Sequence, residues 1–242
     1  MAETAPGHGC ADLHVHTDFS DGADSPRDVL QRARQTELDV IAITDHDSID
    51  GAIIAWELAT HSRIGPEVIV GEEVSSRDGH ILALFIRRLV PPGLSARETV
   101  AAIQEQGGIA IAAHPYWRHE SNGGRGWVYS VGDEIASVPF DAVEVMNGGF
   151  TPSMIKANAR AARTARDLAM TEVGGSDAHV SHAVGWAYTR FPGSSARDLG
   201  DAIMRGQTQA ARTRPGLDGI GRYAIWSLGR MRPQPAQPVA VG

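Results

Sequence analysis

Residues 10–22, CADLHVHTDFSDG, hold the pattern on which the fold prediction depends. They begin as a short apolar run from Cys10 to Val15 and include two histidines, His14 and His16, with one residue between them. Side chains at positions i and i+2 of a β-strand point to the same face. The two imidazoles can therefore approach one ion together from the end of a strand.

Further apolar runs follow along the chain, and most of them alternate with helical patterns. The runs cover residues 38–44, 68–75, 80–86, 109–113, 142–146 and 170–174. Helices are expected from Ser25-Pro26, over 48–61, from Ser95 to Gly107-Gly108, over 152–169 and over 195–206, and residues 184–191 could add a strand. Such alternation is typical of α/β folds. Seven units without a glycine-rich nucleotide fingerprint favour a barrel, although an open sheet gives the same alternation.

Composition limits the class of protein. A chain of 242 residues, 42% hydrophobic and 21% charged, is too apolar for a disordered or fibrous protein. The 22 Lys+Arg against 29 Asp+Glu give a net charge of −7, which argues against a polybasic surface for nucleic acid or membrane. No apolar run approaches the ~18 residues of a membrane span. The single cysteine, Cys10, and an N-terminus unlike a signal peptide predict a cytoplasmic protein.

The chain reads as one domain with two short extensions. We expect a flexible lead over residues 1–9, a catalytic domain over 10–229 and a proline-rich tail over 230–242. No linker or internal repeat divides the central part.

Metal-ligating residue types stand at the ends of nearly all the apolar runs, where parallel α/β folds carry their chemistry. Six of the ten histidines occupy these positions: His14, His16, His46, His80, His114 and His179. The others lie in the lead, a helix or loops: His8, His61, His119 and His182. A single such histidine is more often a structural residue than a ligand. Six unrelated structural histidines, however, would not all be expected at the ends of apolar runs. Imidazoles beside carboxylates suit Zn, Mn or Fe, and this many ligands predict two or three ions.

The segments DLHVHTDFSDG, ITDHD, GEEVS, HILALFI, AHP, VEVMN and GSDAH follow one another in this order over residues 10–212. The ordered set resembles the PHP (polymerase and histidinol phosphatase) superfamily of metal-dependent phosphoesterases. The resemblance implies a single-domain α/β fold, a distorted (β/α)7 barrel with up to three metal ions. It implies a first ion on His14, His16, Glu73 and Asp177, a second on Glu73, His80 and His114, and a third on Asp21, His46 and His179. Glu73 would bridge, and Glu72 would face away or support the site.

Further residues are expected around the ions. Two carboxylates are expected to orient ligands or a water: Asp45 and Glu144. Asp177 or His179 could protonate the leaving oxygen. Three side chains are candidates for substrate contact: Arg118, Arg125 and Asn147. Asn147 could instead close a turn before the glycines that follow it.

The implied reaction is hydrolysis of a phosphoester by a hydroxide that bridges the first two ions. The expected substrate is a small phosphorylated metabolite or nucleotide, either a phosphomonoester or a short phosphodiester. Long nucleic acid is not expected, because its binding depends on many Lys and Arg contacts. Two alternatives stay open: a metal-dependent hydrolase of C–N or C–O bonds, and a non-catalytic, metal-stabilised interaction domain.

Overall fold

A computed structural model describes residues 8–62, 65–117, 119–120, 127–128 and 130–230. Its strands are β1 (His8–Asp12), β2 (Val40–Ile43), β3 (Glu67–Ser76), β4 (Gly79–Leu84), β5 (Ile109–Ala112), β6 (His119–Glu120), β7 (Trp127–Val128), β8 (Ala142–Asn147), β9 (Glu172–Gly175), β10 (Ala187–Pro192) and β11 (Gln209–Arg212). Its α-helices are α1 (Pro26–Ala33), α2 (Asp50–Ser62), α3 (Ala96–Gln104), α4 (Pro152–Asp167), α5 (Ala196–Met204) and α6 (Leu217–Arg230). Short 3-10 helices cover Gly132–Ala136 and Ser181–Ala183.

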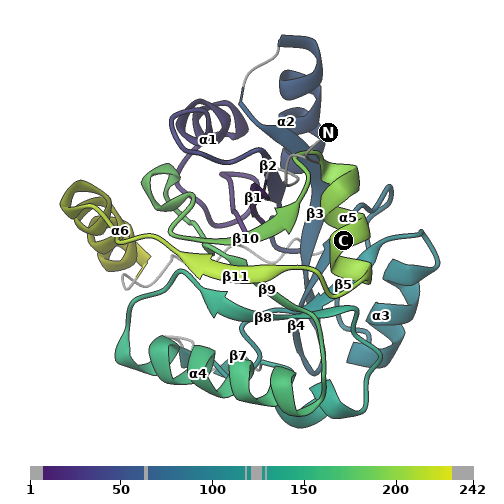
Figure 1. The fold of residues 1–242 in the computed structure, drawn as a ribbon. Coiled ribbons are helices and arrows are strands. Elements are labelled where there is room, and N and C mark those ends of the chain that lie inside the picture. The colour runs from purple at the N-terminus through teal and green to yellow at the C-terminus, as the bar shows by residue number, and fades with distance from the viewer. Residues whose placement is uncertain (1–7, 63–64, 118, 121–126, 129, 231–242) are drawn as a thin grey trace, which may run out of the picture.

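The described strands, apart from the small β6–β7 pair, form one curved sheet in the order β11-β10-β1-β2-β3-β4-β5-β8-β9 (Figure 1). The sheet nearly closes where β9 meets β10. There the Thr189 hydroxyl accepts from the backbone N–H of Gly174 at 2.9 Å and donates to its carbonyl at 2.8 Å. A side chain thus joins the two strands, and the predicted α/β barrel is confirmed.

The barrel departs from an all-parallel one at β4. The β1–β2–β3 and β5–β8–β9 groups are parallel. Strand β4 is antiparallel to both β3 and β5. Only Arg77 and Asp78 separate β3 from β4, whereas a parallel connection needs about a dozen residues. The short spacing between the third and fourth apolar runs therefore forces a hairpin, and this is the distortion of the barrel.

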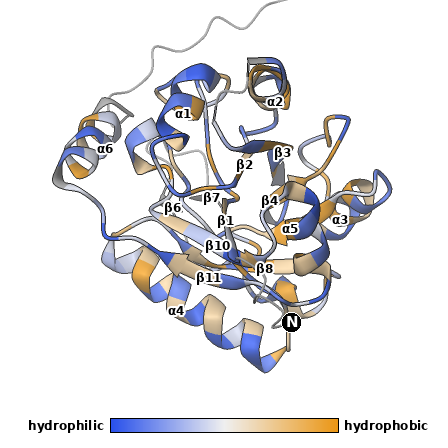
Figure 2. Ribbon diagram, turned by 45° about the horizontal axis from the view of Figure 1, so that its top comes forward, coloured by the Kyte–Doolittle hydropathy of each residue, from blue (hydrophilic) through white to orange (hydrophobic). Residues whose placement is uncertain are grey.

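The helices begin where capping residues stand. The Ser25 side chain accepts from the backbone N–H of Asp28 with Pro26 at the first helical position, and Ser95 forms the predicted capping box with Glu98. Figure 2 shows hydrophilic and hydrophobic residues sharing α4, whose buried residues recur every three or four positions. Strand β11 was not predicted, and neither was helix α6, whose three glycines lower its helix propensity.

Three apolar clusters make up the core. One combines side chains from eight strands of the sheet with the apolar face of α5, so it fills the barrel interior. The second lies under α3 and α4, and the third under α1, α2 and α6. Within the described parts of the chain, no helix is long and apolar enough to cross a membrane.

Candidate metal centre

All the residues predicted to bind metal meet at one end of the barrel. Most of them follow the parallel strands, Glu73 lies near the end of β3, and His80 is the second residue of β4. Because β4 runs antiparallel, its first residues lie beside the last residues of β3, with His80 paired to Ser75. The hairpin therefore brings the one ligand candidate at a strand start to the same end as the others.

Glu73 lies at the centre of this cluster and is 1% exposed. Its Oε2 atom lies 3.1, 3.2 and 3.3 Å from ring nitrogens of three histidines, which are His14, His16 and His46. Its Oε1 atom lies 2.9 and 3.0 Å from ring nitrogens of two others, which are His80 and His114. The two oxygens thus face different sets of histidines, which is the arrangement that a bridging carboxylate requires.

The first predicted group has the spacing of a coordination shell. The Nε2 atoms of His14 and His16 lie 3.1 and 3.2 Å from Glu73 Oε2 and 3.4 and 3.3 Å from Asp177 Oδ1. Ligand atoms on a tetrahedron with bonds of about 2.0–2.1 Å are separated by about 3.3–3.4 Å. Both Nε2 atoms are buried without a hydrogen-bond partner. These residues therefore fit a divalent ion.

The third group is larger than predicted. His179 Nε2 lies 3.2 Å from Asp21 Oδ1, and His46 Nε2 lies 3.8 Å from Asp21 Oδ2. His16 joins them, with its Nδ1 atom 3.5 Å from Asp21 Oδ1. His16 and His46 each face Glu73 with their other nitrogen. The groups therefore share histidines as well as Glu73.

Glu144 stands behind two of the ligand candidates. Its Oε1 atom lies 3.0 Å from His14 Nδ1, and its Oε2 atom accepts from the backbone N–H of His114 at 2.8 Å. A carboxylate accepts a proton from Nδ1, so the Nε2 atom of His14 keeps its lone pair for an ion. These contacts are those that an orienting role requires.

Asp45 has other partners than we expected. Its carboxylate accepts from the backbone N–H and hydroxyl of Thr17 and from the hydroxyl of Ser20, each at 2.7 Å. Asp45 thus fixes the loop that carries Asp21, while the orientation of His46 or a water by Asp45 stays a prediction.

Asn147 is fully buried, and its amide is used inside the protein. It donates to Glu144 Oε2 at 3.2 Å and to Asp177 Oδ2 at 3.1 Å, and accepts from the backbone N–H of Gly149 at 3.0 Å. These contacts give Asn147 a positioning role and close the turn to Gly149 that the sequence left as an alternative, while its contact with substrate stays a prediction. The two arginines predicted to contact substrate, Arg118 and Arg125, lie outside the described residues.

Glu72 faces away from the cluster, and its carboxylate accepts a hydrogen bond from the backbone N–H of Val90 at 2.9 Å.

The cluster strongly shifts its own proton equilibria. Burial lowers the pKa of His16, but the carboxylates of Asp177 and Glu73, at 3.3 and 3.2 Å from its Nε2 atom, more than offset this and raise it to about 10. Burial lowers the pKa of His46 to about 4, with help from the charge of His16. Burial acts to raise the pKa of Glu73, yet the surrounding histidines, His46 first among them, hold it well below its usual range. An ion that binds here displaces protons from histidine.

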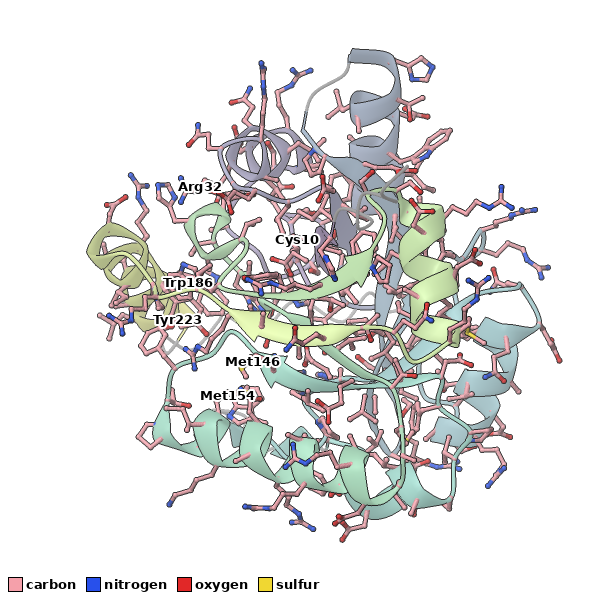
Figure 3. The ribbon with its side chains drawn as sticks, in the orientation of Figure 1. Cys10, Arg32, Met146, Met154, Trp186 and Tyr223 are labelled. Carbon is pink, nitrogen blue, oxygen red and sulfur yellow. The ribbon has the colours of Figure 1, made fainter. Side chains whose placement is uncertain are left out.

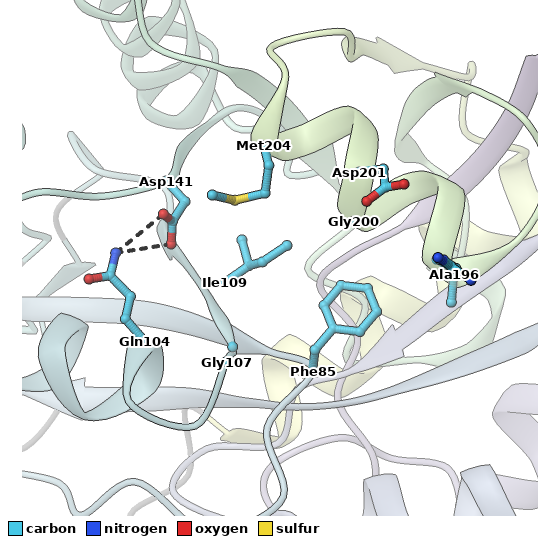
Figure 4. A pocket seen from close by; sticks show the side chains of 11 residues that line it. Phe85, Gln104, Gly107, Ile109, Asp141, Ala196, Gly200, Asp201 and Met204 are labelled. Carbon is cyan, nitrogen blue, oxygen red and sulfur yellow. Dashed lines mark hydrogen bonds between the residues drawn. The ribbon is translucent and has the colours of Figure 1, made fainter.

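A wide hollow at the opposite end of the strands is not part of this centre (Figure 4). It has a volume of ≈ 540 Å³ and is lined by residues such as Phe85, Ile109 and Met204. Phe85 follows the last residue of β4 and Ile109 begins β5, whereas the ligand candidates His80 and His114 lie at the other ends of these strands. The hollow therefore lies far from the ligand candidates, and its large volume is no reason to place the reaction there.

Two family models match the chain, the PHP domain over residues 12–112 and the PHP-associated segment over residues 156–208. A protein of Methanocaldococcus jannaschii without an assigned function is 37% identical over 148 residues, which are 57% of this chain and 81% of that protein. A phosphoribosyl 1,2-cyclic phosphate 1,2-diphosphodiesterase of Eggerthella lenta is 40% identical over 86 residues, 33% of this chain and 32% of the enzyme. A 5′-3′ exoribonuclease of Haemophilus influenzae is 34% identical over 104 residues, 41% of this chain and 37% of the enzyme.

The fold is also similar to that of a two-domain protein from Bacteroides vulgatus that contains a PHP-like metal-dependent phosphoesterase. The TM-score is 0.69 at 20% identity, over 86% of this chain and 65% of the other. The chain belongs to the PHP family and has the fold of its metal-dependent phosphoesterases.

Proposed function

We propose that this protein hydrolyses the phosphoester bond of a small phosphorylated metabolite or nucleotide, with two or three Mn, Zn or Fe ions held by the cluster. The position of Glu73 carries the proposal, because its two oxygens face separate histidine sets at 2.9 to 3.3 Å. Bound divalent ions supply Lewis acidity and a water of lowered pKa. A single structural ion would need no carboxylate shared in this way.

The residues of the cluster would have two roles, binding the ions and orienting the residues that bind them. Nine would hold ions: His14, His16, Asp21, His46, Glu73, His80, His114, Asp177 and His179. Glu144 and Asn147 fix the side chains of His14 and Asp177 from behind. For proton donation to the leaving oxygen we retain Asp177 and His179, whose side chains are 13% and 11% exposed and so open to solvent. Arg118 and Arg125 would neutralise phosphoryl oxygens.

A small substrate is supported by the acidic balance of the chain, with its net charge of −7, because long nucleic acid is bound mainly through many cationic contacts. The similarity to a cyclic phosphodiesterase agrees with this choice. The similarity to an exoribonuclease makes a short oligonucleotide the second substrate to test.

We propose a cytoplasmic location for the enzyme, with its single cysteine as support.

Phosphorus NMR of the manganese-loaded protein tests the proposal. The mixture contains a phosphomonoester, a nucleoside 3′,5′-bisphosphate, a cyclic phosphodiester and a short oligonucleotide. We expect loss of one small-substrate resonance with growth of its product, and no such change with Asp177→Ala. Asp201→Ala, an exposed carboxylate on α5 beside the far hollow, is the matched control and should behave as the wild type. No change in any resonance with ions bound would overturn the proposal, and cleavage of the oligonucleotide alone would overturn its small-substrate part.

A further inference from the structure

Helix α6 contacts one group of the ligand candidates directly. The indole N–H of Trp226 donates to the backbone carbonyl of Asp21 at 3.1 Å, and the ring centroid of Trp226 lies 4.5 Å from that of His179. Asp21 and His179 both belong to the third group, together with His16 and His46. One side chain of α6 therefore contacts two of the four residues that would hold the third ion.

Further aromatic contacts hold α6 in the position that these two contacts require. Tyr223 lies one turn before Trp226, and their ring centroids are 5.3 Å apart. Tyr223 also packs on Trp186, at 5.9 Å, and Figure 3 shows these two side chains side by side. A Cβ atom at position 219 would lie 2.8 Å from Trp186 Cζ2, so Gly219 permits this close approach of the helix. The docking of α6 on Trp186 thus keeps Trp226 beside the third group.

The two segments that Trp226 contacts are also joined to each other. The backbone N–H of Ala23, in the loop that carries Asp21, donates to the carbonyl of His179 at 2.8 Å. The backbone N–H of Ser181 donates to Asp24 Oδ2 at 2.6 Å. The loop of Asp21, the segment of His179 and helix α6 therefore form one connected unit.

The third group depends on such support more than the first group does. The side chains of His46, Asp21 and His179 are 27, 18 and 11% exposed. Those of His14 and Glu73, in the first group, are 0 and 1% exposed. Since water reaches the third group more easily, contacts that keep its side chains in place decide how long an ion stays there.

His179 is fixed for metal binding by two different contacts. Its Nδ1 atom lies 3.0 Å from the backbone carbonyl of Asp177, and because a carbonyl only accepts, Nδ1 carries the proton. Nε2 then keeps its lone pair, and it lies 3.2 Å from Asp21 Oδ1. The Trp226 ring packs against the imidazole and restricts its rotation away from this position. An ion on Nε2 would make the imidazole more positive, which the electron-rich face of an indole favours.

We propose that Trp226 is a positioning residue for the third ion, because it fixes both the loop of Asp21 and the ring of His179. Helix α6 thereby sets how tightly this one ion is held. The helix lies outside the residues that the family models match, which end at residue 208. The inference rests on the metal-binding part of the proposed function and is independent of which phosphoester is hydrolysed.

Release of Co²⁺ from the loaded full-length protein into excess chelator tests the proposal, with metal content measured per chain. Trp226→Phe loses the N–H donor but keeps a ring, so one ion should leave about 3–10-fold faster. Trp226→Leu loses the donor and the ring, so the same ion should leave at least about 10-fold faster. The other ions should leave at the wild-type rate. Trp56→Phe, at an indole 45% exposed on α2, is the matched control and should behave as the wild type.

Tryptophan fluorescence separates positioning from a general loss of structure. Co²⁺ quenches an indole that lies close to it, so release of the third ion should raise the fluorescence of the wild type and of Trp56→Phe. This rise should be largely lost in Trp226→Phe, although the ion still leaves. Each variant is compared as protein with native circular dichroism, and Trp226→Phe carries the test alone if Trp226→Leu fails to fold.

Identical release of every ion from the wild type and the Trp226 variants would overturn the role of Trp226 and leave the phosphoesterase function intact. Equal acceleration of all the ions would also overturn it, because the effect would then be a general loss of structure. Faster release of one ion from a protein that hydrolyses no phosphoester would support the inference and overturn the proposed function. A wild-type protein that binds no Co²⁺ would overturn both.

Discussion

Replacement of Glu144 by Gln tests how the cluster is oriented. Glu144 accepts three hydrogen bonds, from His14 Nδ1 at 3.0 Å, from the backbone N–H of His114 at 2.8 Å and from Asn147 Nδ2 at 3.2 Å. A glutamine of the same shape offers one acceptor oxygen and one donating amide. Its oxygen best replaces Oε2, which accepts two of the three bonds. The amide N–H2 group then faces His14 Nδ1.

This arrangement forces His14 into its other tautomer. Nδ1 must accept from the new amide, so the proton moves to Nε2. Nε2 is the atom that lies 3.1 Å from Glu73 and 3.4 Å from Asp177, and a protonated nitrogen cannot bind an ion. Loss of a residue that orients a metal ligand typically weakens metal affinity 10–100-fold. At about 1.4 kcal/mol for each factor of ten, we expect Glu144→Gln to cost about 1.4–2.8 kcal/mol of binding free energy.

Titration of Zn or Mn against a competing chelator, with metal content per chain, measures this loss. Glu72→Gln is the control, because Glu72 is also buried but faces away and accepts one backbone hydrogen bond, from Val90. Glutamine can accept that bond equally well, so the affinity should stay that of the wild type. Wild-type affinity in Glu144→Gln, in protein whose circular dichroism shows a native fold, would refute the tautomer argument.

Three further outcomes are expected. Trp226→Phe loses the indole N–H bond to the Asp21 carbonyl at 3.1 Å, worth about 0.5–1.5 kcal/mol, so an ion held by Asp21, His46 and His179 should dissociate several-fold faster into a chelator. His16, with its pKa raised to about 10, is protonated at pH 7, so metal binding should release at least one proton, and apparent affinity should rise from pH 7 towards 10; calorimetry in buffers of different ionisation enthalpy measures the release. Asp12→Asn should lower the free energy of unfolding by about 1–3 kcal/mol in a denaturant titration, because the Asp12 carboxylate accepts from three backbone N–H groups that an amide cannot all satisfy.

The meeting of the ligand candidates at one edge could be predicted from the sequence because strands fix their positions. A ladder of backbone hydrogen bonds sets where each strand ends, so residue types at the ends of separate runs meet at one edge. His80 shows how far this holds. It lies near the start of its strand, and only the short link between β3 and β4 reveals that this strand is reversed and brings His80 to the same edge.

The sequence could not predict which ligand candidates share one ion, because strand ends do not determine it. His16 faces Asp21 with Nδ1 and Glu73 with Nε2, and ring rotation decides which group it serves. The partners of Asp45 and Asn147 are equally local matters of side-chain direction. In both cases the residue type was compatible with several contacts, and the packing of a neighbouring loop selected one of them.

Helix α6 shows why the organic part of the substrate is harder to predict than the reaction. Its Trp226 donates to the carbonyl of Asp21, 205 residues earlier in the chain, and no ladder of strand pairing fixes this approach. The contact depends on how one short helix docks on Trp186 through Gly219. The ligand candidates are tied to the sheet, whereas segments such as α6 can change while the sheet stays the same. Substrate preference in such a barrel should therefore be sought in the segments outside its strands.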